Sequence, residues 1–382
     1  MLLKVRNSTG QTLAVLHPVF ALTGVLHTVG GALLPSLAVA FHLSDIDSGI
    51  LFLLYFAGTS LGALLCRGNY ARAMAFGFVA MMACCIGVAL ASRPLLPLAF
   101  LLLGISVGVP MSAVSLFAGR TFPEGCAPVL TFLNFSWSAG ALAAPLLAAQ
   151  ILRHHSYQAA YLLFAVAGAV AALACGLLLK DSPETSRSLS GTRDFIAVRL
   201  ILVFSFAAFL QVGIENTVAA WLPTYALRMA GHGIALAAAS SALYWAGFLS
   251  SRGFSSLLLM RAEPMRIFRI ATAVALVAAA LLVIAPSVAG RGVAMFMLGA
   301  ALAPIYPIVI AGSFARVRHT SDSRWVLATA GFGGSVLPWL AGLISAHTGS
   351  LRIGMLTIPI ALLLMAALIP ALRGTRAVVA EP

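Results

Sequence analysis

The sequence predicts an all-α membrane protein with twelve transmembrane helices in two six-helix bundles, related as parallel repeats, and with both termini in the cytoplasm. Three observations predict this fold. The 382-residue chain is 61% hydrophobic and only 9% charged, with a mean hydropathy of +1.03, which lies outside the range of soluble domains. Apolar stretches of about 20 residues, long enough to cross a bilayer, recur along the chain. The two halves of the chain also align with each other.

The apolar stretches define twelve expected spans, and almost all the connections between them are short. Several spans are longer than a bilayer requires, which permits tilt. The longest polar stretch, KDSPETSRSLSGTRDF, follows the sixth span. We therefore expect an N-terminal bundle at 1–180, a cytoplasmic linker at 181–199 and a C-terminal bundle at 200–382. The expected spans are 12–41, 48–66, 70–91, 94–119, 126–152, 158–180, 200–228, 234–259, 266–288, 290–314, 324–347 and 351–372.

The basic residues indicate how the chain is oriented in the membrane. A net charge of +13 and a pI of about 10.4 could indicate binding to nucleic acid. Most of the 23 lysines and arginines, however, fall on one side of the membrane if the N-terminus is inside. Cytoplasmic loops carry such an excess, so we expect a multi-pass protein of a bacterial inner membrane with no nucleic-acid partner. The basic residues expected outside are Arg93, Arg153, Arg228, Arg291 and Arg352.

Equivalent segments occur in the same order in the two halves. Each match is short, but the offset between the matched segments is nearly constant along the chain. Duplicated six-helix units that hold a substrate between them are the plan of a large class of secondary transporters. The matched segments are HTVGGALLPSLA (27–38) with ENTVAAWLPTYA (215–226), LLYFAG (53–58) with ALYWAG (242–247), and Gly140 and Pro145 with Gly333 and Pro338.

Over essentially its whole length the chain resembles the major facilitator superfamily. Gly213, Glu215, Trp221 and Tyr225, with LNFSWSAGALAAPLL in the fifth span, are similar to the fucose and glucose–galactose permease group. This resemblance implies alternating access and movement of a sugar together with a cation. Two features depart from it. The loop motif GALLCRGNYARA lacks the usual Asp, and the first and fourth spans lack the carboxylates of proton-coupled sugar permeases.

Glu215 is the one of the ten acidic residues that we expect deep inside a span. A charged carboxylate costs about 3 kcal/mol there, so it must face a polar space, find a partner or bind a proton. Every Lys and Arg is expected near a span end, whereas His27 occupies the repeat-equivalent position. We expect Glu215 and His27 to lie at matching depth and to couple ion movement, since both groups can exchange protons near neutral pH. The alternative is that each residue only forms hydrogen bonds with a neighbouring helix.

Polar and aromatic residues of the fifth, seventh and eighth spans form the expected substrate site. Gln211 lies one helical turn before Glu215, and Asn216 directly follows it. Amides and carboxylates bind vicinal hydroxyls, and an indole covers the apolar face of a sugar ring, as a hexose requires. The alternative is hydrogen bonding between helices. The expected substrate-binding residues are Asn134, Trp137, Gln211, Asn216, Tyr244 and Trp245.

The leading hypothesis for function is a symporter of a monosaccharide with H⁺. Sodium, which prefers several oxygen ligands, is the alternative ion, at Glu215, Asn216 and Thr217. An exporter of drugs or amphipathic metabolites in exchange for H⁺, and a non-transporting receptor or scaffold, are the other functions left open. The sequence has no HExxH, GxSxG or P-loop motif, which argues against an enzyme and against ATP-driven transport. We expect no cofactor, no metal site other than sodium, a small-molecule substrate, and function as a monomer in the lipid bilayer.

Overall fold

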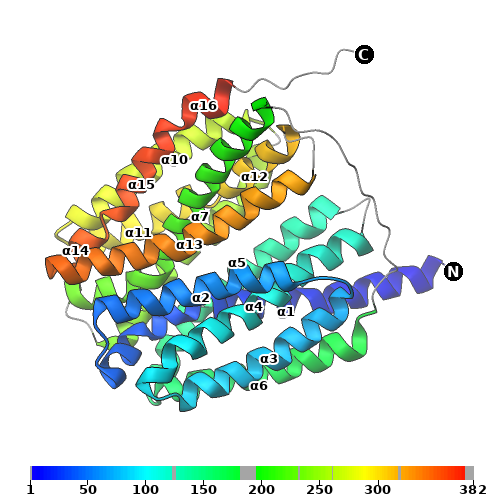
Figure 1. Ribbon diagram of the computed structural model, residues 1–382, viewed down its shortest axis with the longest axis horizontal. Helices are drawn as coiled ribbons and strands as arrows, with labels where there is room; N and C mark the ends of the chain where they lie inside the picture. The colour runs from blue at the N-terminus through cyan, green and yellow to red at the C-terminus, as the bar shows by residue number, and fades with distance from the viewer. Residues whose placement is uncertain are drawn as a thin grey trace. The chain divides into compact units, whose positions relative to one another are not determined.

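The structure is a computed structural model that describes residues 2–122, 126–180, 195–230, 233–259, 261–316 and 320–374. Helices account for nearly all of these residues (Figure 1). In chain order they are α1 (Leu2–Phe41), α2 (Asp45–Leu65), α3 (Tyr70–Leu90), the 3-10 helix η1 (Arg93–Leu95), α4 (Leu96–Thr121), α5 (Cys126–Leu152), α6 (Tyr157–Leu178), α7 (Phe195–Ala230), α8 (Ile234–Ser240), α9 (Ala242–Leu259), α10 (Pro264–Ile284), α11 (Val288–Leu302), α12 (Ile305–Arg316), α13 (Thr320–Thr348), α14 (Leu351–Gly354), α15 (Thr357–Ala367) and α16 (Ile369–Gly374).

Most of the expected spans correspond to helices of membrane-spanning length. Within the described ranges, 11 helices are long and apolar enough to cross a bilayer, and Leu351–Ala367 forms a shorter apolar stretch. The expected twelfth span, 351–372, is divided among α14, α15 and α16. The all-α membrane fold is therefore confirmed. Twelve full spans and the cytoplasmic location of both termini stay predictions.

Proline explains the interruption inside the expected tenth span. α11 ends at Leu302, and α12 begins at Ile305, directly after Pro304. Proline has no backbone N–H to donate to the preceding turn, and its ring clashes with the carbonyl four residues earlier. Pro307 is tolerated in the first turn of α12, where a backbone N–H has no helical acceptor. The result is one expected span built from two helices.

The chain divides into two compact units. Met1–Thr185 and Leu222–Ala242 form the first unit, and Ser186–Trp221 and Leu243–Pro382 form the second. The division passes through α7, whose last residues belong to the first unit. α8 also belongs to the first unit, because it packs against α5 and α1. The expected bundle boundaries at residues 180 and 200 stay a prediction.

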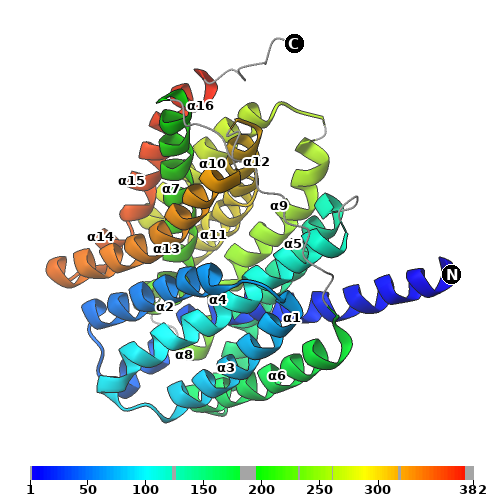
Figure 2. The same cartoon turned by 45° about the vertical axis from the view of Figure 1, so that its right-hand side comes forward.

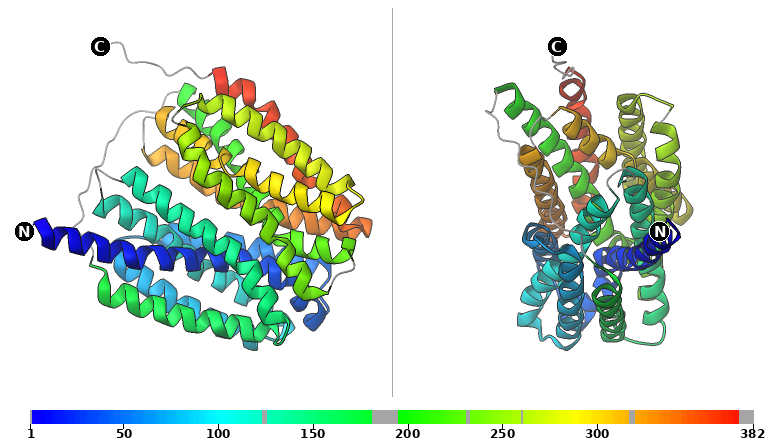
Figure 3. Two further views of the ribbon diagram at one scale, coloured as in Figure 1. Left: turned by 180° about the vertical axis from the view of Figure 1, so that it is seen from behind. Right: turned by 90° about the vertical axis from the view of Figure 1, so that its right-hand side faces the viewer.

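Within each unit the helices pack in pairs. In the first unit α2 packs against α4, and α3 packs against α6 (Figure 1). α1 runs along this unit and extends past the other helices at its N-terminal end (Figure 3). In the second unit α10 packs against α11 and α12 (Figure 2). The exposed surfaces of these helices carry many large apolar side chains, as a lipid-facing surface does.

Glycines permit the same helix crossing in both units. In the first unit a Cβ atom on Gly140 of α5 would collide with the backbone carbonyl of Ala21 in α1. In the second unit a Cβ atom on Gly333 of α13 would collide with the carbonyl of Phe209 in α7. The repeat alignment pairs both glycines and also pairs Ala21 with Phe209. Only glycine allows so close an approach of two helix backbones.

A second crossing is repeated in the same way. Gly104 of α4 lies against the backbone of Tyr55 in α2, and Gly299 of α11 lies against the backbone of Tyr244 in α9. Tyr55 and Tyr244 are the equivalent tyrosines of the aligned segments LLYFAG and ALYWAG. The closest helix contacts of the two units therefore repeat as the sequence alignment predicts.

Candidate functional site

The predicted site residues fall into two clusters, one in each unit. The predicted pairing of His27 with Glu215 joins residues of different units and stays a prediction. The first cluster contains His27, Asn134 and Trp137, and the second contains Gln211, Glu215, Asn216, Thr217, Tyr244 and Trp245.

In the first cluster His27 lies among aromatic side chains. The centroid of its ring is 5.5 Å from that of Trp137 in α5 and 5.2 Å from that of Phe56 in α2. The indole is 7% exposed, and His27 is half-buried. Asn134, one turn before Trp137, donates its Nδ2 to the carbonyl of Leu130 in its own helix at 2.8 Å. The structure therefore brings His27 and Trp137 together, and part of the hydrogen-bonding capacity of Asn134 is used locally.

In the second cluster Gln211 joins α7 to the end of α11. Its Nε2 donates to the carbonyl of Leu302 at 3.1 Å. Leu302 is the last residue of α11, where carbonyl groups have no donor within the helix. The Oε1 atom of Gln211 is buried and accepts no hydrogen bond from the residues that the structure describes. Such an atom requires a donor, and a substrate hydroxyl can supply one.

Asn216 donates a hydrogen bond to a backbone carbonyl that has no helical donor because a proline follows four residues later. Its Nδ2 donates to the carbonyl of Gly334 in α13 at 3.3 Å, and Pro338, four residues later, has no N–H to give that carbonyl. In the first unit the equivalent residue, Thr28, donates its hydroxyl to the carbonyl of Gly24 in its own helix at 3.0 Å, and the same oxygen lies 3.4 Å from the carbonyl of Ala141, again four residues before a proline. Asn216 thus has a role in helix packing, and its contact with substrate stays a prediction.

Glu215 has a basic neighbour that the sequence analysis missed. Arg252 of α9 attracts Glu215 electrostatically, and both charges act on Tyr244 and on Tyr306 of α12. The expectation that no Lys or Arg comes near Glu215 is therefore wrong. That expectation assumed that the charge of Arg252 lies at the same depth in the membrane as its backbone. A long side chain can carry its guanidinium a full helical turn away from the backbone. That guanidinium lies 4.7 Å from the centroid of the Phe248 ring, a cation–π distance.

A helical face of α9 could have revealed this neighbour. Tyr244, Phe248 and Arg252 recur every fourth residue, which places them on one face. The ring centroids of Tyr244 and Trp245 are 4.9 Å apart, and both side chains are almost completely buried. The face that carries Tyr244 therefore also carries Arg252, which interacts electrostatically with Glu215.

Two repeat-equivalent tyrosines differ in how their hydroxyl groups are satisfied. Tyr55 donates its hydroxyl to the carbonyl of Leu26 at 2.9 Å. The hydroxyl of Tyr244, a completely buried side chain, has no hydrogen-bond partner among the residues described. A buried hydroxyl without a partner is costly. Tyr244, which interacts electrostatically with Glu215 and Arg252, is therefore suited to bind a substrate or a water molecule.

Glu215 is more accessible than its neighbours along α7. It is half-buried, whereas Ile214, Asn216 and Thr217 are each less than 5% exposed. Thr217 donates its hydroxyl to the carbonyl of Gly213 in its own helix at 2.7 Å. Proton exchange by the carboxyl of Glu215 stays a prediction, and the hydroxyl of Thr217 donates within its own helix.

Ion pairs lie at one end of the first unit. Arg228, near the end of α7, holds Asp45 at the start of α2 through two contacts of 2.8 and 2.5 Å. Arg93 in η1 lies 3.2 Å from Asp47, also in α2. Arg228 belongs to the expected C-terminal bundle, and Asp45 belongs to the N-terminal one. The Asp45–Arg228 pair therefore links the two expected bundles within one compact unit.

Comparison with known families identifies the class of protein. Residues 16–323 match the family model of the Major Facilitator Superfamily. The chain belongs to this superfamily. It is therefore a multi-pass membrane transporter and not an enzyme. No sequence of a curated protein matches the chain significantly.

Solved structures of superfamily members share the fold. A D-xylose–proton symporter matches with a TM-score of 0.78 and 15% identity over 96% of this chain and 99% of that one. The nucleoside transporter NupG matches with a TM-score of 0.75 and 14% identity over 95% and 99%. The transporter FucP, in an outward conformation, matches with a TM-score of 0.63 and 18% identity over 94% and 98%. At such identities the similarity shows the fold alone.

Proposed function

We propose that this superfamily member is a secondary active transporter that moves a monosaccharide together with H⁺ by alternating access. The observation that carries the proposal is Glu215, a partly accessible carboxyl in an apolar span beside Arg252 and the buried hydroxyl of Tyr244. The similar fold of a D-xylose–proton symporter supports a sugar as the substrate.

The charges of the second unit suggest how proton and sugar binding are linked. Without a proton, Glu215 and Arg252 attract each other and neutralise one another's charge. A proton on Glu215 removes this attraction, and the guanidinium can then donate to sugar hydroxyl oxygens. Tyr244 can donate a further hydrogen bond, and the Oε1 of Gln211 can accept one. Proton and sugar are thus expected to bind together, which is the requirement for symport.

The ion pair between α2 and α7 supports alternating access. Asp45 and Arg228 belong to different expected bundles, and the expected topology places both on the outer side. Any movement that separates the bundles at this end must break the pair. The pair therefore has the position of a closing contact on the outer side.

The observed contacts also rank the alternatives. Sodium requires several oxygen ligands, and Glu215 is the one carboxylate expected deep inside a span, so H⁺ is favoured. Export of a cationic drug is disfavoured because Arg252 already supplies a positive charge beside Glu215. The proposal includes a monomer in a bacterial inner membrane that needs no cofactor.

Uptake by purified protein in proteoliposomes tests the proposal. We expect an imposed pH gradient to drive accumulation of labelled glucose, galactose or fucose by the wild type. Glu215→Gln should abolish this accumulation and retain exchange of sugar, because the variant can still bind substrate but carries no proton. Glu263→Gln is the matched control, since Glu263 is an exposed acid at the start of α10.

Two results would contradict the proposal in different ways. If no sugar moves under either a pH or a sodium gradient, the substrate class is wrong, and a screen for export of cationic amphiphiles comes next. If Glu215→Gln accumulates sugar as the wild type does, Glu215 is not the coupling residue. If only a sodium gradient drives uptake, sodium replaces H⁺ in the scheme.

A further inference from the structure

We propose that a cavity between the start of α3 and the end of α6 binds the phosphate headgroup of an anionic phospholipid. The cavity has a volume of about 450 Å³ and lies entirely within the first unit, where α3 and α6 pack side by side (Figure 1). Neither helix carries a residue of the two clusters described above. The cavity is therefore a separate site, and it does not depend on the proposed substrate.

Small residues create the space between the two helices. Ala75 of α3 and Gly176 of α6 both line the cavity. A Cβ atom on Gly176 would lie 3.9 Å from the Cβ of Ala75, which is an ordinary contact. Phe76 and Leu179 provide further apolar wall. The part of the cavity lined by these apolar residues thus suits the glycerol and the first acyl carbons of a lipid.

Basic groups from both helices line the same cavity. Arg72 lies in the first turn of α3, and Lys180 follows α6; both side chains line the cavity and both are exposed. The Oδ1 of Asn69 caps α3 by accepting a hydrogen bond from the backbone N–H of Arg72 at 2.8 Å. The N-terminal end of a helix adds partial positive charge. Two cations and a helix N-terminus form a suitable site for a phosphate diester.

The surface beside the cavity favours a lipid over a soluble phosphate. Phe76, Leu177 and Leu178 are 71%, 75% and 64% exposed, so large apolar side chains border the basic groups. In a membrane protein such a surface faces acyl chains. The positive-inside pattern places this end of α3 and α6 in the cytoplasmic leaflet, which carries the anionic lipids. A soluble phosphate would use the two cations and leave the apolar wall uncovered.

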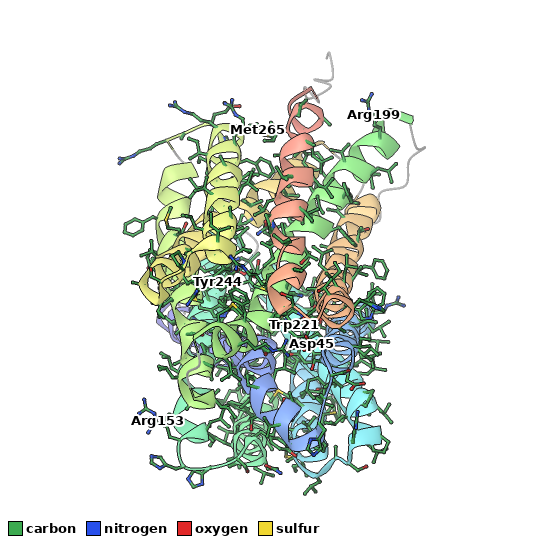
Figure 4. The ribbon with its side chains drawn as sticks, turned by 90° about the vertical axis from the view of Figure 1, so that its left-hand side faces the viewer. Asp45, Arg153, Arg199, Trp221, Tyr244 and Met265 are labelled. Carbon is green, nitrogen blue, oxygen red and sulfur yellow. The ribbon has the colours of Figure 1, made fainter. Side chains whose placement is uncertain are left out.

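Thermal unfolding of the purified full chain in detergent tests the site. We expect added phosphatidylglycerol to raise Tm, and phosphatidylcholine or inorganic phosphate to leave it nearly unchanged. In Arg72→Gln/Lys180→Gln, about 30-fold more phosphatidylglycerol should be needed for the same rise, since each basic residue near an anionic surface contributes roughly a fivefold factor. Arg153→Gln/Arg199→Gln removes the same charge from two exposed arginines that do not line the cavity (Figure 4), and it should respond as the wild type does.

A second variant tests the shape of the cavity without changing its charge. Gly176→Leu should fill the space and weaken the response to phosphatidylglycerol, and Ala75→Leu replaces it if that variant does not fold. The proposal is overturned if the Arg72/Lys180 variant keeps the wild-type response, or if phosphatidylcholine raises Tm equally. It is also overturned if inorganic phosphate competes with the lipid, because the site would then bind soluble phosphate.

Discussion

The tyrosines Tyr55 and Tyr244 show how one residue type at equivalent positions can serve packing in one unit and function in the other. Tyr55 donates to Leu26, whereas the hydroxyl of Tyr244 has no partner within the described ranges. We expect Tyr55→Phe to lower the free energy of unfolding by about 1 kcal/mol and to leave uptake intact. Tyr244→Phe should raise the free energy of unfolding by about 1 kcal/mol, because it removes a buried hydroxyl that has no partner, and should reduce sugar uptake about tenfold, the effect of one lost hydrogen bond to the substrate.

Both variants should be measured on the same preparations, by unfolding in detergent and by initial uptake rates in proteoliposomes. Each variant is the control for the other, because the same atom is removed from the same repeat position. If Tyr244→Phe is destabilised as much as Tyr55→Phe and transports normally, the hydroxyl of Tyr244 has a structural role only.

At the level of the helix, the side chain of Asn216 supplies the hydrogen-bond donor that Pro338 lacks in its backbone. We expect Asn216→Ala to destabilise the protein by about 1 kcal/mol, because the carbonyl of Gly334 loses its donor. In a Pro338→Ala background the cost of Asn216→Ala should fall toward zero, since the alanine that replaces the proline supplies a backbone N–H to that carbonyl. Unfolding of the two single variants and the double variant measures this coupling, and additive effects would show that the proline does not matter.

The helices themselves were largely predictable, whereas their interruptions and side-chain contacts were not. Hydropathy located the spans because a bilayer requires about 20 apolar residues in each. It did not reveal that α11 ends before Pro304 or that 351–372 divides into three helices, because hydropathy averaged over a span does not respond to one proline or to how a single turn packs. Gln211 and Asn216, which the sequence predicts to bind substrate, are buried, and the carbonyls to which they donate lie about 90 and 120 residues further along the chain.

For the whole molecule, the Asp45–Arg228 pair predicts how the outer end opens. We expect Asp45→Asn to raise, about fivefold, the rate at which a membrane-impermeant maleimide labels a cysteine introduced at Thr224. Thr224 is 5% exposed and lies one turn before Arg228 in α7, so it becomes accessible when this end opens. Asp45→Arg/Arg228→Asp should restore slow labelling.

Asp47→Asn is the matched control for this prediction. It removes the same charge from the same helix, but its partner, Arg93, belongs to the same expected bundle as Asp47. It should therefore leave the labelling rate at Thr224→Cys unchanged. Equal labelling of all these variants would mean that the Asp45–Arg228 pair does not hold the outer end closed.

The sequence by itself determined that the chain is a duplicated bundle of apolar helices with one carboxylate deep in a span. These properties follow from hydropathy and repeated segments, which are local features of the chain. Only the tertiary structure decided that Arg252 interacts with Glu215 and that Asn216 donates to the carbonyl that Pro338 leaves without a helical donor. It also decided that Tyr244, unlike its equivalent Tyr55, has no hydroxyl partner among the described residues. The physical reason is that a side chain's partner depends on its direction and on which helix backbone lies opposite, and neither is encoded by spacing along the chain.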